Sequence, residues 1–183
     1  MRLFVGLDLP ASVKSKLSEL LDRLRPAARL KWSPVSNLHL TTKFIGEWPE
    51  QKLPEMVTAL QSVSVPAQGL AIGIRGLGWF PNPHHPRVLW AGVIAPPALV
   101  ALARATDQAT AELGVPVEER DYSPHLTLAR IKDPTPLTAL QQAVAKLASV
   151  DCGQFTPTAF YLYHSKTGPS GSVYTKLAEF PLQ

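Results

Sequence analysis

The chain has 183 residues, of which 45% are hydrophobic and 17% charged, and its net charge is +4. These values are typical of a soluble globular protein and exclude a disordered or low-complexity chain. The single cysteine, Cys152, excludes a fold built on internal disulfides, and we expect it to be a small buried residue in a reducing cytoplasm. Apolar stretches are too short to span a bilayer, and the opening MRLFVGLDLP lacks a signal peptide's cleavage region, so a cytoplasmic protein without membrane attachment is expected.

Strand and helix patterns alternate through the first half of the chain. An apolar strand is predicted over residues 2–9, and a helix over 10–25 follows, with a proline at its start and leucines at helical spacing. The stretch NLHLTTKFIG, residues 37–46, is a predicted strand because it is rich in β-branched and aromatic residues. A helix over 49–63 and a glycine-weakened strand over 67–80 complete this half.

The same order of elements then begins again. The predicted elements are a strand over 87–94, a helix over 96–114, a strand over 123–131 that contains SPHLTLARI, a helix over 135–149, and a strand over 152–165. The two series align at one offset of 86 residues, which indicates an internal duplication.

The duplication predicts a single bilobal domain of the α+β class. Repeat 1 covers about residues 1–80, repeat 2 about 86–166, and an additional C-terminal strand about 172–180. Two such units would form two lobes around a pseudo-two-fold axis. Equivalent residues of the two lobes would then face each other across a central cleft.

The tripeptide His-Leu-Thr occurs at equivalent positions of both repeats. Alternation in a strand puts His39 and Thr41 on one face and Leu40 on the other, and the same holds for His125 and Thr127. Histidine exchanges protons near neutral pH, so a facing pair can supply one base and one acid. That pair suits in-line displacement at phosphorus, with the threonine hydroxyls donating hydrogen bonds to the non-bridging oxygens and no metal required.

One His-x-Thr match in a chain of this length is uninformative. The two matches here share the central leucine, lie in strand-like segments and fall at the repeat offset. Together they favour a functional pair over two structural histidines.

The segments LKWSPVSNLHLTTKFIGE and YSPHLTLAR, with MRLFVGLDLP and FPNPHHPRVLWAGV, resemble the 2H phosphoesterases. Within that superfamily the chain is similar to the bacterial and archaeal RNA 2′,3′-cyclic phosphodiesterases, also called 2′-5′ RNA ligases, over nearly its whole length. The resemblance implies a bilobal α+β fold in which two antiparallel sheets line a central cleft and the helices lie outside.

The resemblance also implies an activity and a partner. His39 would be the proton donor to the leaving oxygen and His125 the proton acceptor that activates water, whereas the residues alone leave open which is which. The substrate would be RNA with a 2′,3′-cyclic phosphate end, the product would carry a 2′-phosphate, and the reverse reaction would join RNA ends through a 2′-5′ linkage. We expect a monomer that needs no cofactor.

Two basic residues are further candidates for phosphate binding. Lys43 follows Thr41 by two positions, so alternation predicts that it shares the His39 face; it contacts either phosphate or solvent. Arg130 lies on the face opposite His125 by simple alternation, but the resemblance favours a place near the phosphate over a surface salt bridge. Tyr122 and Trp48 flank the motif strands, and either is considered for stacking on a terminal base.

His84 and His85 are read as loop residues, because no cysteine or carboxylate cluster accompanies them as a metal site would require. Two alternatives to the RNA enzyme stay open. The same chemistry could act on a small cyclic nucleotide phosphate, or the chain could be a non-catalytic RNA-binding module.

Overall fold

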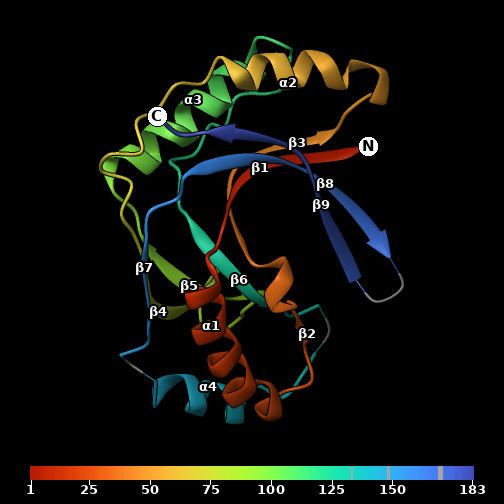
Figure 1. Ribbon diagram of the computed structural model, residues 1–183. Helices are drawn as coiled ribbons and strands as arrows, with labels where there is room; N and C mark the ends of the chain where they lie inside the picture. Colours follow the sequence, from red (N-terminus) through yellow and green to blue (C-terminus); the bar gives the residue numbers. More distant parts are fainter. Residues whose placement is uncertain (133, 148, 169–170) are drawn as a thin grey trace.

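Two antiparallel sheets organise the chain in the computed structural model, which describes residues 1–132, 134–147, 149–168 and 171–183 (Figure 1). The first sheet has the strand order β3-β1-β8-β9 and the second the order β2-β6-β5-β4-β7. The strands are β1 Arg2–Asp8, β2 Lys31–Trp32, β3 His39–Glu47, β4 Ile72–Phe80, β5 Val88–Ile94, β6 His125–Arg130, β7 Asp151–Phe155, β8 Ala159–Gly168 and β9 Gly171–Pro181. With the helices described next, this arrangement confirms the predicted α+β class.

Helices lie outside the sheets. They are α1 Ala11–Leu24, α2 Leu53–Gln61, α3 Pro97–Ala111 and α4 Thr138–Ala145, with short 3-10 turns η1 Arg25–Ala27, η2 Val35–Asn37 and η3 Glu50–Lys52. Helices α2 and α3 contact each other on the first-sheet side, while α1 contacts β7 of the second sheet and lies beside α4 (Figure 1). Residue 148 of the helix predicted over 135–149 lies outside the described residues.

Each sheet contains a strand from the other predicted repeat. Strand β1 lies between β3 and β8, and β5 lies between β6 and β4, so the centres of the two sheets have the same arrangement. However, β4 belongs to repeat 1 and pairs in the second sheet, and β8 belongs to repeat 2 and pairs in the first. The two lobes are therefore interlocked rather than consecutive along the chain.

The prediction of one strand over 152–165 is wrong. The segment forms β7 in the second sheet and β8 in the first, with a break at Thr156 and Pro157. Proline has no N–H to donate to a strand ladder, so the strand ends before it and the chain changes sheet.

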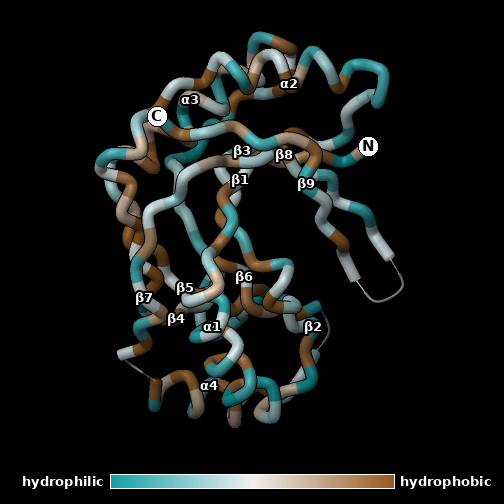
Figure 2. Tube along the Cα trace, in the orientation of Figure 1, coloured by the Kyte–Doolittle hydropathy of each residue, from teal (hydrophilic) through white to brown (hydrophobic). Residues whose placement is uncertain are grey.

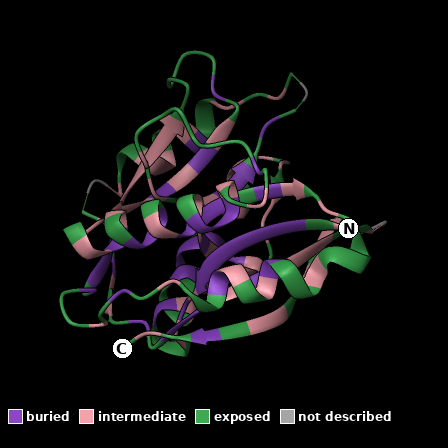
Figure 3. Ribbon diagram, turned by 90° about the horizontal axis from the view of Figure 1, so that it is seen from above, coloured by how far each residue is buried: buried purple, intermediate pink, exposed green. Residues whose placement is uncertain are grey.

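Hydrophobic side chains between sheets and helices form the core. Strand β1 contributes Leu3, Val5 and Leu7, and α1 contributes a buried stripe at helical spacing: Val13, Leu17, Leu20, Leu21 and Leu24. Figure 3 shows the buried residues concentrated in the central strands, with exposed residues on the outer faces of the helices. Cys152 is 2% exposed, as the sequence predicted.

Polar and apolar residues are interspersed along the helices (Figure 2). Within the part of the chain that the structure describes, every helix is too short or too polar to cross a membrane.

Candidate active site

Both histidine strands contain a β-bulge at the same place in the motif. In the first sheet, Gly6 lies opposite Thr41 but Val5 lies opposite Lys43, so Thr42 is an extra residue. In the second sheet, β6 has its extra residue at Leu128, because Thr127 and Ala129 lie opposite consecutive residues of β5. The bulges reverse the alternation of side chains after each threonine.

Histidine and threonine share a face in each motif. Residues opposite each other in an antiparallel pair point the same way, so His39 and Thr41 lie on the face of Asp8 and Gly6, and Leu40 points into the core. We call this the first motif face. The second motif face carries His125 and Thr127 beside Gly92 and Trp90 of β5.

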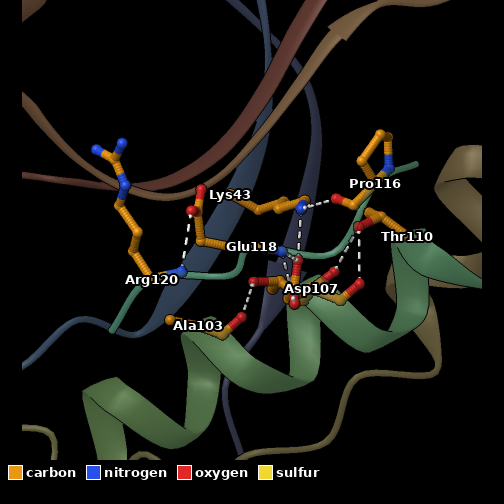
Figure 4. A network of polar contacts seen from close by, with 8 residues as sticks. Lys43, Ala103, Asp107, Thr110, Pro116, Glu118 and Arg120 are labelled. Atoms are coloured by element: carbon orange, nitrogen blue, oxygen red, sulfur yellow. Dashed lines mark hydrogen bonds and ion pairs between the residues drawn. The ribbon is translucent and has the colours of Figure 1, made fainter. Parts of the chain in front are cut away.

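The prediction that Lys43 shares the His39 face is wrong. After the bulge at Thr42, Lys43 points away from the first motif face toward α3 and is buried. Its Nζ donates to the carboxylate of Asp107 in α3 and, at 2.6 Å, to the carbonyl of Pro116 (Figure 4). Lys43 therefore anchors the first sheet to α3 and is not among the residues placed to bind phosphate.

The corresponding bulge at Leu128 has the opposite consequence for Arg130. Simple alternation put this residue on the face opposite His125, and that expectation is also wrong. Arg130 lies opposite Val88, which shares its face with Trp90 and Gly92, so the exposed guanidinium is on the second motif face.

His39 lies among aromatic rings. Its imidazole stacks on Phe4 at 4.5 Å between ring centroids and meets the edge of Tyr174 at 5.0 Å, with Tyr163 at 5.8 Å. Burial lowers the pKa of His39 below its usual value, although its hydrogen bond to Asn37 and the negative charge of Asp8 oppose the shift.

Both catalytic candidates have their Nδ1 atoms fixed in the same way. His39 Nδ1 lies 2.7 Å from the carbonyl oxygen of Asn37, and His125 Nδ1 lies 2.9 Å from that of Ser123. Because a carbonyl oxygen only accepts, each Nδ1 carries the proton, and Nε2 of the neutral ring keeps its lone pair. His125 differs in being exposed.

A side chain from the segment before each motif binds the backbone of the other motif. Tyr122, three residues before His125, donates its hydroxyl proton to the carbonyl of Thr41 at 2.8 Å. Ser33, six residues before His39, donates from Oγ to the carbonyl of Thr127 at 2.7 Å. These bonds join the two motifs, consistent with the contact between β3 and β6.

Sequence reasoning missed this role of both residues. Tyr122 was expected as a stacking platform, but it is partly buried and its hydroxyl is engaged; burial raises the pKa of that hydroxyl, which keeps it a donor. The available signal was the similarity of WSP at residues 32–34 to YSP at 122–124.

Asp8 is a charged residue on the first motif face that the sequence did not single out. Its carboxylate accepts from Lys14 at 2.7 Å and from Lys176 at 2.6 Å. Burial disfavours the charged form, but these bonds and one from the backbone N–H of Leu9 outweigh it and lower the pKa of Asp8. Asp8 therefore stays ionised beside His39.

His84 and His85 are exposed residues of the loop between β4 and β5, and their backbone N–H groups donate to Asn82 Oδ1. Among the described residues, no three His, Cys, Asp or Glu side chains are grouped so as to hold a metal ion.

Comparisons with known proteins identify the family of the chain. The family model "LigT like Phosphoesterase" matches residues 7–90 and 94–174. An RNA 2′,3′-cyclic phosphodiesterase of Methanothermobacter thermautotrophicus is 34% identical over 183 residues, which cover 100% of this chain and 99% of the relative.

Solved structures are similar over the whole fold. A crystal structure of a Thermus thermophilus protein has a TM-score of 0.83 at 33% identity and covers 100% of this chain and 98% of its own. Escherichia coli LigT complexed with 3′-AMP has a TM-score of 0.74 at 26% identity, over 99% of this chain and 97% of its own. The resemblance stated from the sequence is thereby confirmed, and the chain belongs to the LigT-like phosphoesterase family.

Proposed function

We propose that this protein is an RNA 2′,3′-cyclic phosphodiesterase that opens the cyclic phosphate at an RNA 3′ end and leaves a 2′-phosphate. The observation that carries the proposal is the matched pair of imidazoles, each fixed through Nδ1 by the carbonyl two residues earlier, with Nε2 available for proton transfer. The names of relatives such as the Methanothermobacter protein support the substrate.

In the proposed reaction the phosphate lies between the two motif faces. His125 takes a proton from water through Nε2 as the water oxygen attacks phosphorus, and the bond from phosphorus to O3′ breaks. His39, protonated at Nε2, gives its proton to O3′, so the 2′-phosphate remains on the ribose. The exposure of His125 suits the histidine that must admit water.

The lowered pKa of His39 bears on this assignment. Burial disfavours the imidazolium in the free protein, and a proton donor has to be protonated when substrate is bound. The negative charge of the bound phosphodiester favours the imidazolium and offsets the burial. Once protonated, an imidazole in an apolar site gives up its proton more readily.

The remaining motif residues stabilise charge. The hydroxyls of Thr41 and Thr127 lie on the two motif faces, where they can donate to the non-bridging oxygens, and Arg130 supplies a positive charge on the second face. Because each step uses protein side chains, we expect turnover without a metal ion. With a 5′-hydroxyl in place of water, the same steps would join two RNA ends through a 2′-5′ linkage. Both histidines come from one chain, so a monomer would suffice.

The proposal is tested by incubating the protein, in EDTA, with an oligoribonucleotide ending in a 2′,3′-cyclic phosphate and identifying the product. Hydrolysis to a 2′-phosphate is expected. No hydrolysis, or hydrolysis only after a metal is added, would sink the mechanism, and a 3′-phosphate product would overturn the bond assigned to break. His39→Ala and His125→Ala should lose turnover; loss of binding in a protein that never turns over would favour the RNA-binding module.

A further inference from the structure

A row of basic and apolar side chains crosses the second sheet beyond the motif. Lys31 of β2 lies opposite Arg130 of β6, Arg130 opposite Val88 of β5, and Val88 opposite Phe80 of β4. Opposite residues share a face, so all four lie on the second motif face. We call them the Lys31–Phe80 row.

The row is accessible to a ligand. Phe80 is 59% exposed, Lys31 and Arg130 are exposed, and Val88 between them is partly exposed. The row thus presents one open aromatic ring and two cations to solvent, with Val88 between Phe80 and Arg130.

The row lies within reach of a substrate held at His125. From Gly92, opposite His125, to Val88, opposite Arg130, β5 advances four residues, which is about 13 Å at the rise of a strand. Between them the ring of Trp90 lies against Gly78 of β4, where a Cβ would clash with it. An aromatic and basic surface therefore runs from the motif to Phe80.

This chemistry matches a single-stranded RNA. Lys and Arg attract backbone phosphates, and an exposed aromatic ring stacks on any base without sequence preference. The equivalent face position of the first motif is occupied by the apolar Phe44 instead of an arginine, and the two lysines near the first motif face, Lys14 and Lys176, are bound to Asp8.

We propose that the Lys31–Phe80 row binds the nucleotides that precede the cyclic phosphate, with Lys31 on a backbone phosphate, Phe80 on a base, and Arg130, which lies on the motif strand β6, toward the cyclic phosphate. The preferred substrate is then an oligoribonucleotide, and a single nucleoside 2′,3′-cyclic phosphate is a poorer one. This inference rests on the proposed function and deepens it.

The test compares kcat/KM for a nucleoside 2′,3′-cyclic phosphate and for di-, tri- and tetranucleotides with the same end. For the wild-type protein, kcat/KM should rise at least tenfold with length. Lys31→Ala should reduce that gain and lower the slope of log kcat/KM against log salt by about 0.7 for oligonucleotides. Phe80→Ala should cost roughly 5- to 100-fold on oligonucleotides only.

Lys52→Ala is the matched control, since Lys52 is an exposed lysine of η3 on the first-sheet side. It should behave as wild type on every substrate. Unchanged activity of Lys31→Ala and Phe80→Ala on the mononucleotide shows that both variants are folded.

The proposed role of the Lys31–Phe80 row would be contradicted if the wild-type protein had no preference for longer substrates. It would also be contradicted if the variants lost activity equally on all substrates. If no substrate is hydrolysed, the proposed function fails by itself. Fluorescence anisotropy with a labelled tetranucleotide then still tests whether the row binds RNA. RNA binding by the row is refuted if Lys31→Ala and Phe80→Ala bind the tetranucleotide as tightly as Lys52→Ala.

Discussion

The two motif regions have the same backbone and different surroundings. Each strand has its bulge directly after the threonine, and each histidine is fixed by the carbonyl two residues before it. Yet His39 is enclosed by Phe4, Tyr163 and Tyr174, whereas His125 is open to solvent.

The two bulges expose different residues at equivalent positions. The bulge after the first motif exposes Phe44, at 67%, and the bulge after the second motif exposes Arg130. The backbone thus holds the two imidazoles alike, and the neighbouring side chains give them different surroundings: burial lowers the pKa of His39, and Arg130 places a positive charge on the face of His125. In the proposed reaction, the shared backbone geometry places one imidazole on each side of the phosphate, and the different surroundings assign one as acid and the other as base.

Removal of either imidazole should have the largest effect. His39→Ala and His125→Ala should each reduce kcat about 10²- to 10⁴-fold, the range of one general acid or base, while circular dichroism shows a folded protein. The double variant should lose little more than the worse single variant, because both groups act in one transition state. A variant at one motif that keeps near-normal kcat would mean that only the other histidine is catalytic.

The buried lysine after the first bulge should matter for stability rather than turnover. Lys43→Ala leaves the partly buried Asp107 carboxylate without its cation, which should lower the free energy of unfolding by up to about 3–5 kcal/mol, the cost for a fully buried pair. Denaturant unfolding measures this loss, and kcat per folded molecule should stay near wild type at low temperature. The double variant Lys43→Met with Asp107→Leu should recover much of the stability. If Lys43→Ala instead raised KM and left the stability normal, Lys43 would have to contact the substrate.

The two cross-motif hydrogen bonds should affect positioning. Tyr122→Phe and Ser33→Ala each leave a motif carbonyl without its hydroxyl donor, at a cost of about 1–3 kcal/mol in stability. We expect kcat to fall severalfold to tenfold with KM nearly unchanged, because the histidine and threonine of the motif shift relative to the phosphate.

Trp48→Phe is the control for these variants, since it removes a side-chain donor to the Lys52 carbonyl elsewhere in the first lobe. It should lower stability without changing kcat. Equal losses of kcat in Trp48→Phe and Tyr122→Phe would mean that Tyr122 only stabilises the fold and does not position the motif.

The sequence predicted the α+β class, the strand nature of both motifs and the shared face of each histidine and threonine, because these depend on local periodicity. It missed the bulges, since neither Thr42 nor Leu128 has a local feature such as glycine that marks an extra residue. The predicted faces of Lys43 and Arg130 were wrong because each residue follows one of these bulges. The exchange of β4 and β8 between sheets, and the bonds of Ser33 and Tyr122, depend on contacts between distant segments, which periodicity does not encode.

The smallest expected effect is a pH dependence of stability that comes from the buried His39. The pKa of His39 is lowered in the folded protein, so below the ordinary histidine pKa of about 6.5 the unfolded chain binds more protons than the folded one. The free energy of unfolding should therefore fall as the pH is lowered from 6.5 toward the folded pKa of His39, and this contribution should be constant above 6.5. Urea unfolding across that window should show a shallower slope for His39→Gln than for wild type and Trp48→Phe. An unchanged slope would mean that the aromatic enclosure does not disfavour the imidazolium, and the inequality of the two motifs would then rest on Arg130 and Phe44 alone.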